Sequence, residues 1–143
     1  MLRQVVAVEA LLGIESFGPA SRLTLARSVE AGLPVAALEQ FTANIAPHDA
    51  RFKYRLVPEA TLRRRIRSTG RLSTDESDRL VRLAKVFSFG LEIYGSPEKV
   101  REFLRRPHVM LEGRTPLDLA LATSPGTDLI INLLGRVAYG GAV

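Results

Sequence analysis

Glycine and proline divide the chain into short segments in which apolar residues recur at intervals of three and four. That interval is the repeat of an α-helix, and no long stretch alternates apolar and polar residues as a half-buried strand does. We therefore predict an all-α fold.

The same punctuation marks where the expected helices begin and end. Gly32 follows one of them as a C-terminal glycine, and Pro34 and Pro58 each open a helix at its first turn. Ser73 and Glu76 have the spacing of a capping box, in which each side chain accepts a hydrogen bond from the other residue's backbone N–H. The expected helices cover residues 21–31, 34–46, 48–54, 58–67, 74–94, 97–106, 116–122 and 128–138, with Ser96, Thr115 and Thr127 as further caps.

Two helices carry pronounced apolar faces. The last helix is expected to turn Leu129, Ile130, Leu133, Leu134 and Val137 inward, with Asp128, Asn132 and Arg136 on its other face. The C-terminal half of helix 74–94 is apolar on two sides, which is more than one small domain needs to cover. We therefore expect a homodimer through Phe87, Phe89, Ile93 and Tyr94.

Basic residues are concentrated in the first half of the chain. The net charge of +5 lies entirely in residues 1–71, which hold 11 Lys and Arg against 6 Asp and Glu. This asymmetry favours a polyanionic partner, most simply nucleic acid. An anionic membrane is the weaker alternative, because the basic stretch has few bulky apolar residues to insert. Within residues 51–71, Glu59 alone opposes Arg51, Lys53, Arg55, Arg63, Arg64, Arg65, Arg67 and Arg71.

Helix 58–67 is the expected second helix of a helix-turn-helix. The alternative is a solvated charged face without a ligand. Because four arginines in five positions cannot share one face of a helix, some of them must be solvated or structural in either case. The DNA contacts that we predict come from Thr61, Arg63, Arg64, Arg65 and Arg67.

Several classes of site lack the residues that they need. The chain has no Cys and two His, which excludes a disulfide scaffold, a thiol nucleophile and a Cys/His zinc site. His108 has no partner at a catalytic spacing, and helix initiation explains Asp75, Glu76 and Asp78. We expect neither an enzyme, a metal nor a cofactor. No uncharged apolar run reaches the roughly 18 residues that span a bilayer, so we expect a cytoplasmic protein without membrane association.

Residues 111–119, Leu-Glu-Gly-Arg-Thr-Pro-Leu-Asp-Leu, are followed by Thr123, Gly126, an apolar last helix and Tyr139-Gly140. This pattern resembles the toxin-binding domain of Xre/MbcA/ParS-type antitoxins. The resemblance extends back through residues 73–95, and the first half of the chain resembles the family's helix-turn-helix region more weakly. His108 stands where an Asn is common and Glu112 where a second Gly is common. The resemblance implies an N-terminal bundle at 1–71 that is basic and helix-turn-helix-like. It implies a small helical toxin-binding domain with a C-terminal tail at 72–143.

The resemblance implies an antitoxin of a type II toxin–antitoxin system. Its partner would be a cognate RES-type toxin that consumes NAD or uses it for ADP-ribosylation, and its C-terminal tail would enter the NAD cleft. It would also bind operator DNA and regulate its own operon. Residues 119–143 carry only Asp128 and Arg136 as charged side chains, which suits such a tail, although a frayed C-terminus is the plain alternative. The expected toxin contacts are Arg114, Arg136, Tyr139, Gly140, Gly141, Ala142 and Val143.

One other class of function stays open at this stage. A stand-alone helix-turn-helix transcriptional regulator would account for the basic first half without any toxin. It would have little use for an uncharged tail that contains glycine.

Overall fold

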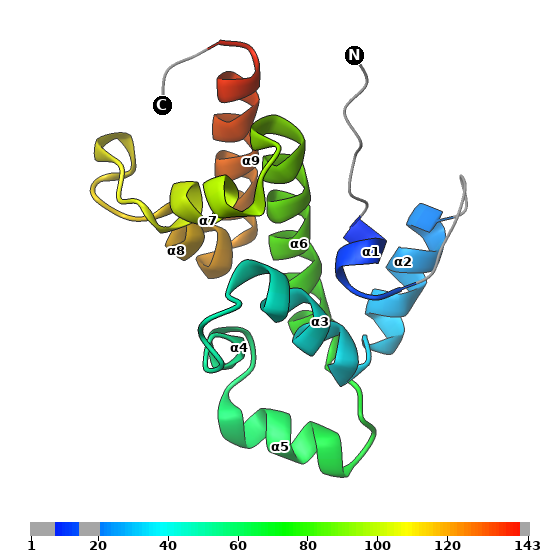
Figure 1. Cartoon of the computed structure of the whole chain (residues 1–143). Helices are drawn as coiled ribbons and strands as arrows, with labels where there is room; N and C mark the ends of the chain where they lie inside the picture. The colour runs from blue at the N-terminus through cyan, green and yellow to red at the C-terminus, as the bar shows by residue number, and fades with distance from the viewer. Residues whose placement is uncertain (1–7, 15–20, 141–143) are drawn as a thin grey trace. The chain divides into compact units, whose positions relative to one another are not determined.

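The computed structural model describes residues 8–14 and 21–140, and every named element within them is a helix (Figure 1). The predicted all-α fold is confirmed. No helix in this part of the chain is long and apolar enough to cross a membrane. The elements are α1 (Val8–Leu11), α2 (Ser21–Ala31), α3 (Val35–Ile45), α4 (Lys53–Leu56), α5 (Glu59–Arg67), α6 (Thr74–Tyr94), α7 (Pro97–Arg105), the short 3₁₀ helix η1 (Val109–Leu111), α8 (Pro116–Ala122) and α9 (Ser124–Ala138).

The described residues form two compact units. One unit ends at Val81 and the other begins at Arg82, so the division falls within α6. The sequence analysis placed the boundary between residues 71 and 72, in the loop before α6. That boundary separates a DNA-binding region from a toxin-binding region, and this division of function stays a prediction.

In the first unit, α3 packs against α1, α4 and α5. Its apolar residues Leu38, Phe41 and Ile45 recur at three and four and are almost fully buried. The segment before α3 is fixed by Ser77 on α6, whose buried Oγ accepts a hydrogen bond of 2.8 Å from the Leu33 backbone N–H. Pro34 was expected in the first turn of this helix. It is the N-cap residue, and α3 begins one position later, at Val35.

In the second unit, α8 packs against both α7 and α9. The turn between α8 and α9 is tight because Gly126 lies against the backbone of Leu119. A Cβ at position 126 would stand 2.1 Å from the Leu119 carbonyl oxygen, so any other residue would force the two helices apart. The most deeply buried apolar side chains of this unit include Leu83, Val86, Phe87, Val100, Leu104, Ile130 and Leu134.

Most of the predicted caps are confirmed. The Glu76 N–H donates to Ser73 Oγ over 3.1 Å and the Ser73 N–H donates to Glu76 Oε1 over 2.7 Å, which completes the capping box. Ser96 caps α7 and Thr115 caps α8, each followed by proline in the first turn.

The expected start of the last helix is wrong. Helix α9 begins at Ser124 with Thr123 as its cap, and Thr123 Oγ1 accepts from the Gly126 N–H over 2.9 Å. Thr127 is buried inside the helix, where its hydroxyl donates to the Ala120 carbonyl over 2.8 Å. The sequence Ser-Pro-Gly at 124–126 is typical of a turn, which is why the helix start was expected later. It is helical here because proline is tolerated in a first helical turn and because Gly126 packs against the preceding helix.

Three further expectations change. Leu129 is 45% exposed, whereas Ile130, Leu133 and Leu134 of the same helix are buried as expected. The short helix expected at 48–54 forms at Lys53–Leu56, because residues 47–52 make turns instead. Phe87 is buried within the molecule, so it cannot contribute to the predicted dimer surface. The dimer itself stays a prediction.

Candidate functional site

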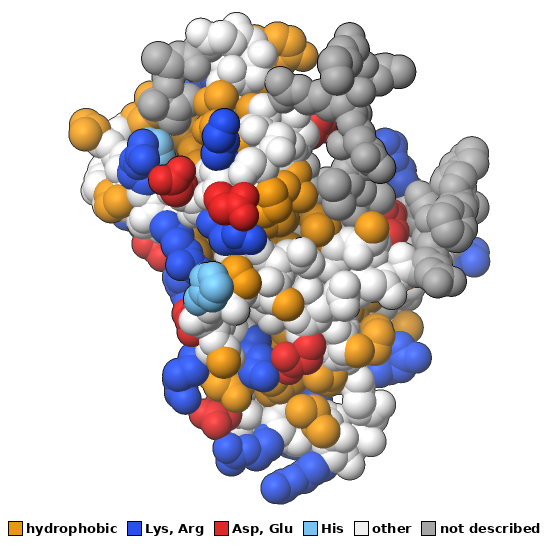
Figure 2. All heavy atoms as spheres, viewed as in Figure 1, with side chains coloured by type: hydrophobic (Ala, Val, Ile, Leu, Met, Phe, Trp, Pro, Cys, Tyr) orange, Lys and Arg blue, Asp and Glu red, His pale blue; other side chains and the backbone are white. Residues whose placement is uncertain are grey.

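Helix α5 presents the basic sequence of the first unit. Val57 and Pro58 are extended and turn the chain from α4 into α5, whose buried residue is Leu62. Most side chains on the other sides of α5 are exposed, among them Arg63, Arg64 and Arg67. Figure 2 shows Lys and Arg side chains gathered over α5, with hydrophobic side chains between them.

The arginines of α5 have different environments, as the sequence argument about helical faces required. Arg63 Nη2 lies 2.9 Å from Oε1 of Glu59, one turn earlier on the same helix. Arg65 is turned toward Glu76 on α6. Arg64 and Arg67 are exposed and have no side-chain polar partner in the described residues. Thr61 is half-buried, near the start of the helix.

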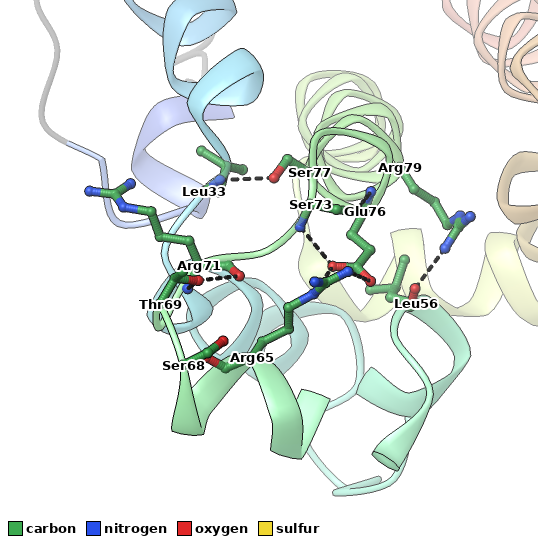
Figure 3. Close-up of polar contacts among 10 residues, drawn as sticks. All are labelled: Leu33, Leu56, Arg65, Ser68, Thr69, Arg71, Ser73, Glu76, Ser77 and Arg79. Carbon is green, nitrogen blue, oxygen red and sulfur yellow. Dashed lines mark hydrogen bonds and ion pairs between the residues drawn. The ribbon is translucent and has the colours of Figure 1, made fainter. Parts of the chain in front are cut away.

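The carboxylate of Glu76 joins α5 to the start of α6. It accepts hydrogen bonds from the Ser73 N–H, from Arg65 Nε over 3.2 Å and from Arg65 Nη2 over 3.3 Å (Figure 3). Burial acts to raise the pKa of Glu76, but the hydrogen bonds from Ser73 and Arg65 outweigh it and leave the pKa below its ordinary value. Glu76 is thus ionised at neutral pH, and Arg65 serves to hold α5 in place.

Other basic side chains also support the fold. Arg79 Nη1 on α6 donates to the Leu56 carbonyl at the end of α4 over 2.7 Å, and Arg71 Nη1 donates to the Gly32 carbonyl over 2.9 Å. Lys53 donates to Glu39 over 2.9 Å, a hydrogen bond that raises the pKa of Lys53. Much of the positive charge of this unit is therefore committed to internal contacts, and Arg64 and Arg67 are the cations of α5 left for an external anion.

The end of α9 is the second surface to which the sequence directs attention. Tyr139 is the residue at the C-terminal cap of α9 and is 95% exposed. Gly140 follows with a φ of +85°, which takes the backbone out of the helical path. Arg136 is exposed on the last turn, together with Asp128 and Asn132 on the same face, as expected. Gly141, Ala142 and Val143 lie outside the described residues.

The loop from Pro107 to Arg114 is the third surface. It contains η1 and ends at Arg114, whose side chain is exposed. Val109 and Met110 also face solvent here, and the sequence reasoning did not single them out. The available signal was a pair of apolar residues inside a segment that Pro107 and Gly113 mark as a loop.

Two family models each match part of the chain. A family model described as the antitoxin Xre-like helix-turn-helix domain matches residues 24–85. A second, described as the antitoxin Xre/MbcA/ParS C-terminal toxin-binding domain, matches residues 90–140. The first match contains α5, and the second contains both the loop 107–114 and the end of α9.

Curated relatives named Antitoxin Xre are similar to the chain. That of Pseudomonas putida is 33% identical over 85 residues, which is 59% of this chain and 53% of the relative. That of Photorhabdus laumondii is 31% identical over 78 residues, 54% of this chain and 52% of the relative. That of Yersinia enterocolitica is 29% identical over 85 residues, 59% of this chain and 57% of the relative. The chain thus spans about half the length of the curated relatives it matches.

Proposed function

Since the chain belongs to the Xre/MbcA/ParS-type antitoxins, we propose that it neutralises a protein toxin through its second unit and binds operator DNA through its first. The observation that carries the first part is the match of residues 90–140 to a toxin-binding domain. A regulator without a toxin would leave that match unexplained.

We further propose that the toxin is of the RES type, uses NAD, and is inhibited when residues 139–143 enter its NAD cleft. Two features support this mechanism. Tyr139 extends almost fully exposed from the end of α9, where it is available as a rigid amphipathic anchor. Between residues 119 and 143 the charged side chains are Asp128 and Arg136, so residues 139–143 enter a cleft without burying an unpaired side-chain charge.

Arg114 and Arg136 are the proposed cations around this contact. Both are exposed, and neither has a side-chain polar partner in the part of the chain that the structure describes. Exposed charges at the rim of an interface guide association more than they add to affinity. We therefore assign these two residues to orienting the toxin as it binds.

The proposed DNA contacts centre on Arg64 and Arg67 of α5. Their guanidinium groups are available for phosphate oxygens, whereas Arg63 is partly neutralised by Glu59. Arg65 positions α5 through Glu76, and the half-buried Thr61 lies near the helix start, where base edges and phosphates come within reach. Binding to the promoter of its own operon would make the antitoxin an autoregulator.

Co-expression in a bacterial host tests the proposed function. The protein encoded by the adjacent gene, which this proposal expects to be the RES-type toxin, is expressed alone and then together with the chain, and cellular NAD and growth are measured. We expect the toxin alone to deplete NAD and arrest growth, and co-expression to restore both. If NAD is lost equally in both cultures while the two proteins are present, the chain is not the antidote to that toxin.

A further inference from the structure

The loop 107–114 carries two apolar side chains that do not pack in the core. Val109 is 97% exposed and Met110 is 57% exposed, and the two are adjacent at η1. In Figure 2, hydrophobic side chains lie beside Lys, Arg and His side chains over the part of the surface that Figure 1 shows as the loop between α7 and α8. Scattered apolar residues are ordinary on a protein surface, so exposure alone does not mark a binding site.

Backbone hydrogen bonds close the loop on itself. The His108 N–H donates to the Arg114 carbonyl over 3.2 Å, and the Gly113 N–H donates to the His108 carbonyl over 2.9 Å. Glu112 has a φ of +57°, which non-glycine residues rarely adopt, and the side chain of Leu111 is buried. A preformed tip loses little conformational freedom when it binds a partner. Such strained residues also cluster at binding sites.

A pocket of about 270 Å³ opens at the base of the loop. The His108 ring forms part of its wall and packs against Phe103, with ring centroids 5.6 Å apart. His108 Nε2 is buried and has no hydrogen-bond partner within the described residues. Lys99 and Arg106 supply positive charge to the same pocket, whose lining is completed by Tyr94 and Glu102. Lys99 and Arg106 outnumber Glu102 in this pocket. In the tautomer that carries its proton on Nε2, the buried and unpartnered His108 nitrogen is a further donor, so the pocket fits a carboxylate group.

We propose that this loop is a docking element for the toxin that acts separately from the tail. Val109 and Met110 enter an apolar groove on the toxin, and an acidic side chain of the toxin enters the pocket between Lys99 and Arg106. The inference rests on the proposed function, because the toxin is the occupant. Under this proposal the loop determines how tightly the toxin binds, and the tail determines whether the bound toxin is inhibited.

The toxin is favoured as occupant over a second copy of the chain. The loop lies within the segment that matches a toxin-binding domain. Exposed Arg105, Arg106 and Arg114 also flank it, against Glu112 at its tip. A symmetric contact between two copies through this loop would bring those cations against their own counterparts, which is unfavourable. A partner with acidic groups around an apolar groove meets no such repulsion.

The test measures, by isothermal titration calorimetry, binding of the purified protein encoded by the adjacent gene, which is the proposed toxin. The variant carries Val109→Ser and Met110→Ser in the full chain. Its matched control is Leu23→Ser, because Leu23 is 56% exposed but lies on α2 in the other unit. We expect the Kd to rise at least tenfold for the double variant and to stay within twofold for the control. At saturating concentration the double variant should still block NAD loss completely, since its tail is unchanged.

A second variant tests the pocket without altering the apolar tip. Arg106→Glu should also raise the Kd at least tenfold, because it places a negative charge where the toxin's carboxylate would bind. Circular dichroism melting curves confirm that each variant is folded before its affinity is compared.

An unchanged Kd in both variants would overturn the docking proposal and leave the proposed function intact. A change in the sedimentation of the chain alone, with unchanged toxin affinity, would show a self-contact and overturn it too. Failure of the wild-type chain to bind the toxin would instead contradict the proposed function, and the docking proposal with it.

Discussion

The guanidinium of Arg65 and the carboxylate of Glu76 form a two-point contact between α5 and α6, with Nε 3.2 Å from Oε1 and Nη2 3.3 Å from Oε2 (Figure 3). Because the same carboxylate completes the capping box of α6, one side chain both starts the long helix and fixes the basic helix beside it. The orientation of α5 toward a ligand therefore depends on a residue that lies outside it.

Replacing Glu76 with Gln should lower the free energy of unfolding by about 1–2 kcal/mol, because it weakens a helix cap and a charge-assisted hydrogen bond. Urea denaturation followed by circular dichroism measures the change. Glu59→Gln is the control, since Glu59 pairs with Arg63 at an exposed position and should contribute less than about 0.5 kcal/mol. Equal midpoints for Glu76→Gln and the wild type would show that this contact does not support the fold.

The same pair predicts how stability depends on pH. The pKa of Glu76 is lower in the folded chain than its ordinary value of 4.5. The stabilisation from its ionised form is thus fully present above about pH 4.5 and is lost as the pH falls through the folded pKa. Melting temperatures of the wild type and Glu76→Gln should differ at pH 7 and converge at more acid pH. A gap that stays constant from pH 7 to pH 3 would contradict this assignment.

The cap of α9 provides a test of the corrected helix start. Thr123→Ala removes the hydroxyl that accepts from the Gly126 N–H and should destabilise the second unit by about 1 kcal/mol. Ser124→Ala, one residue later and exposed, should change the stability little. Thermal melts of the two variants make the comparison, and an equal loss in both would mean that Thr123 is not the cap.

DNA binding should depend on the two available cations of α5. Because each neutralised phosphate contributes about 0.9 to the slope of log affinity against log salt, Arg64→Ala with Arg67→Ala should reduce that slope by about two. Arg63→Ala should reduce it less, since Glu59 already pairs with Arg63. Fluorescence anisotropy with the promoter of the operon, at several salt concentrations, gives the slopes. An undiminished slope in the double variant would place the DNA contacts elsewhere.

The sequence predicts those helix ends that are determined by residues close to them in the chain. Helices α2, α6 and α8 have their expected bounds because a C-terminal glycine, a capping box and a Thr-Pro start are signals read within a few residues. The start of α9 is missed because the need for Gly126 comes from Leu119 on the preceding helix.

The candidate site depends still more on contacts that are distant in the sequence. Helical periodicity shows that the four arginines of α5 must differ, but only the position of Glu76 on α6 determines that Arg65 is the one turned inward. Likewise, Pro107 and Gly113 mark Val109 and Met110 as loop residues, but Leu111 of the same loop is buried, so a loop position alone does not determine their exposure. Their exposure follows from how His108 and Leu111 are anchored.

Under the proposed function, residues 139–143 inhibit the toxin by occupying its NAD cleft. Removing them should leave the fold intact, because the side chain of Tyr139 is almost wholly exposed. Two point variants refine the test: Ala142→Lys should weaken inhibition by placing a charge in the cleft, and Asp128→Asn, on the exposed face of α9, should change little.

The most direct measurement is the rate of toxin-catalysed NAD loss with the full-length chain and with a chain that ends at Ala138, with complex formation checked by gel filtration. We predict that both chains form the complex and that only the full-length chain blocks NAD loss. If the shortened chain forms the complex and blocks NAD loss as well as the full-length chain does, inhibition comes from docking elsewhere on the toxin, and occlusion by the tail is wrong.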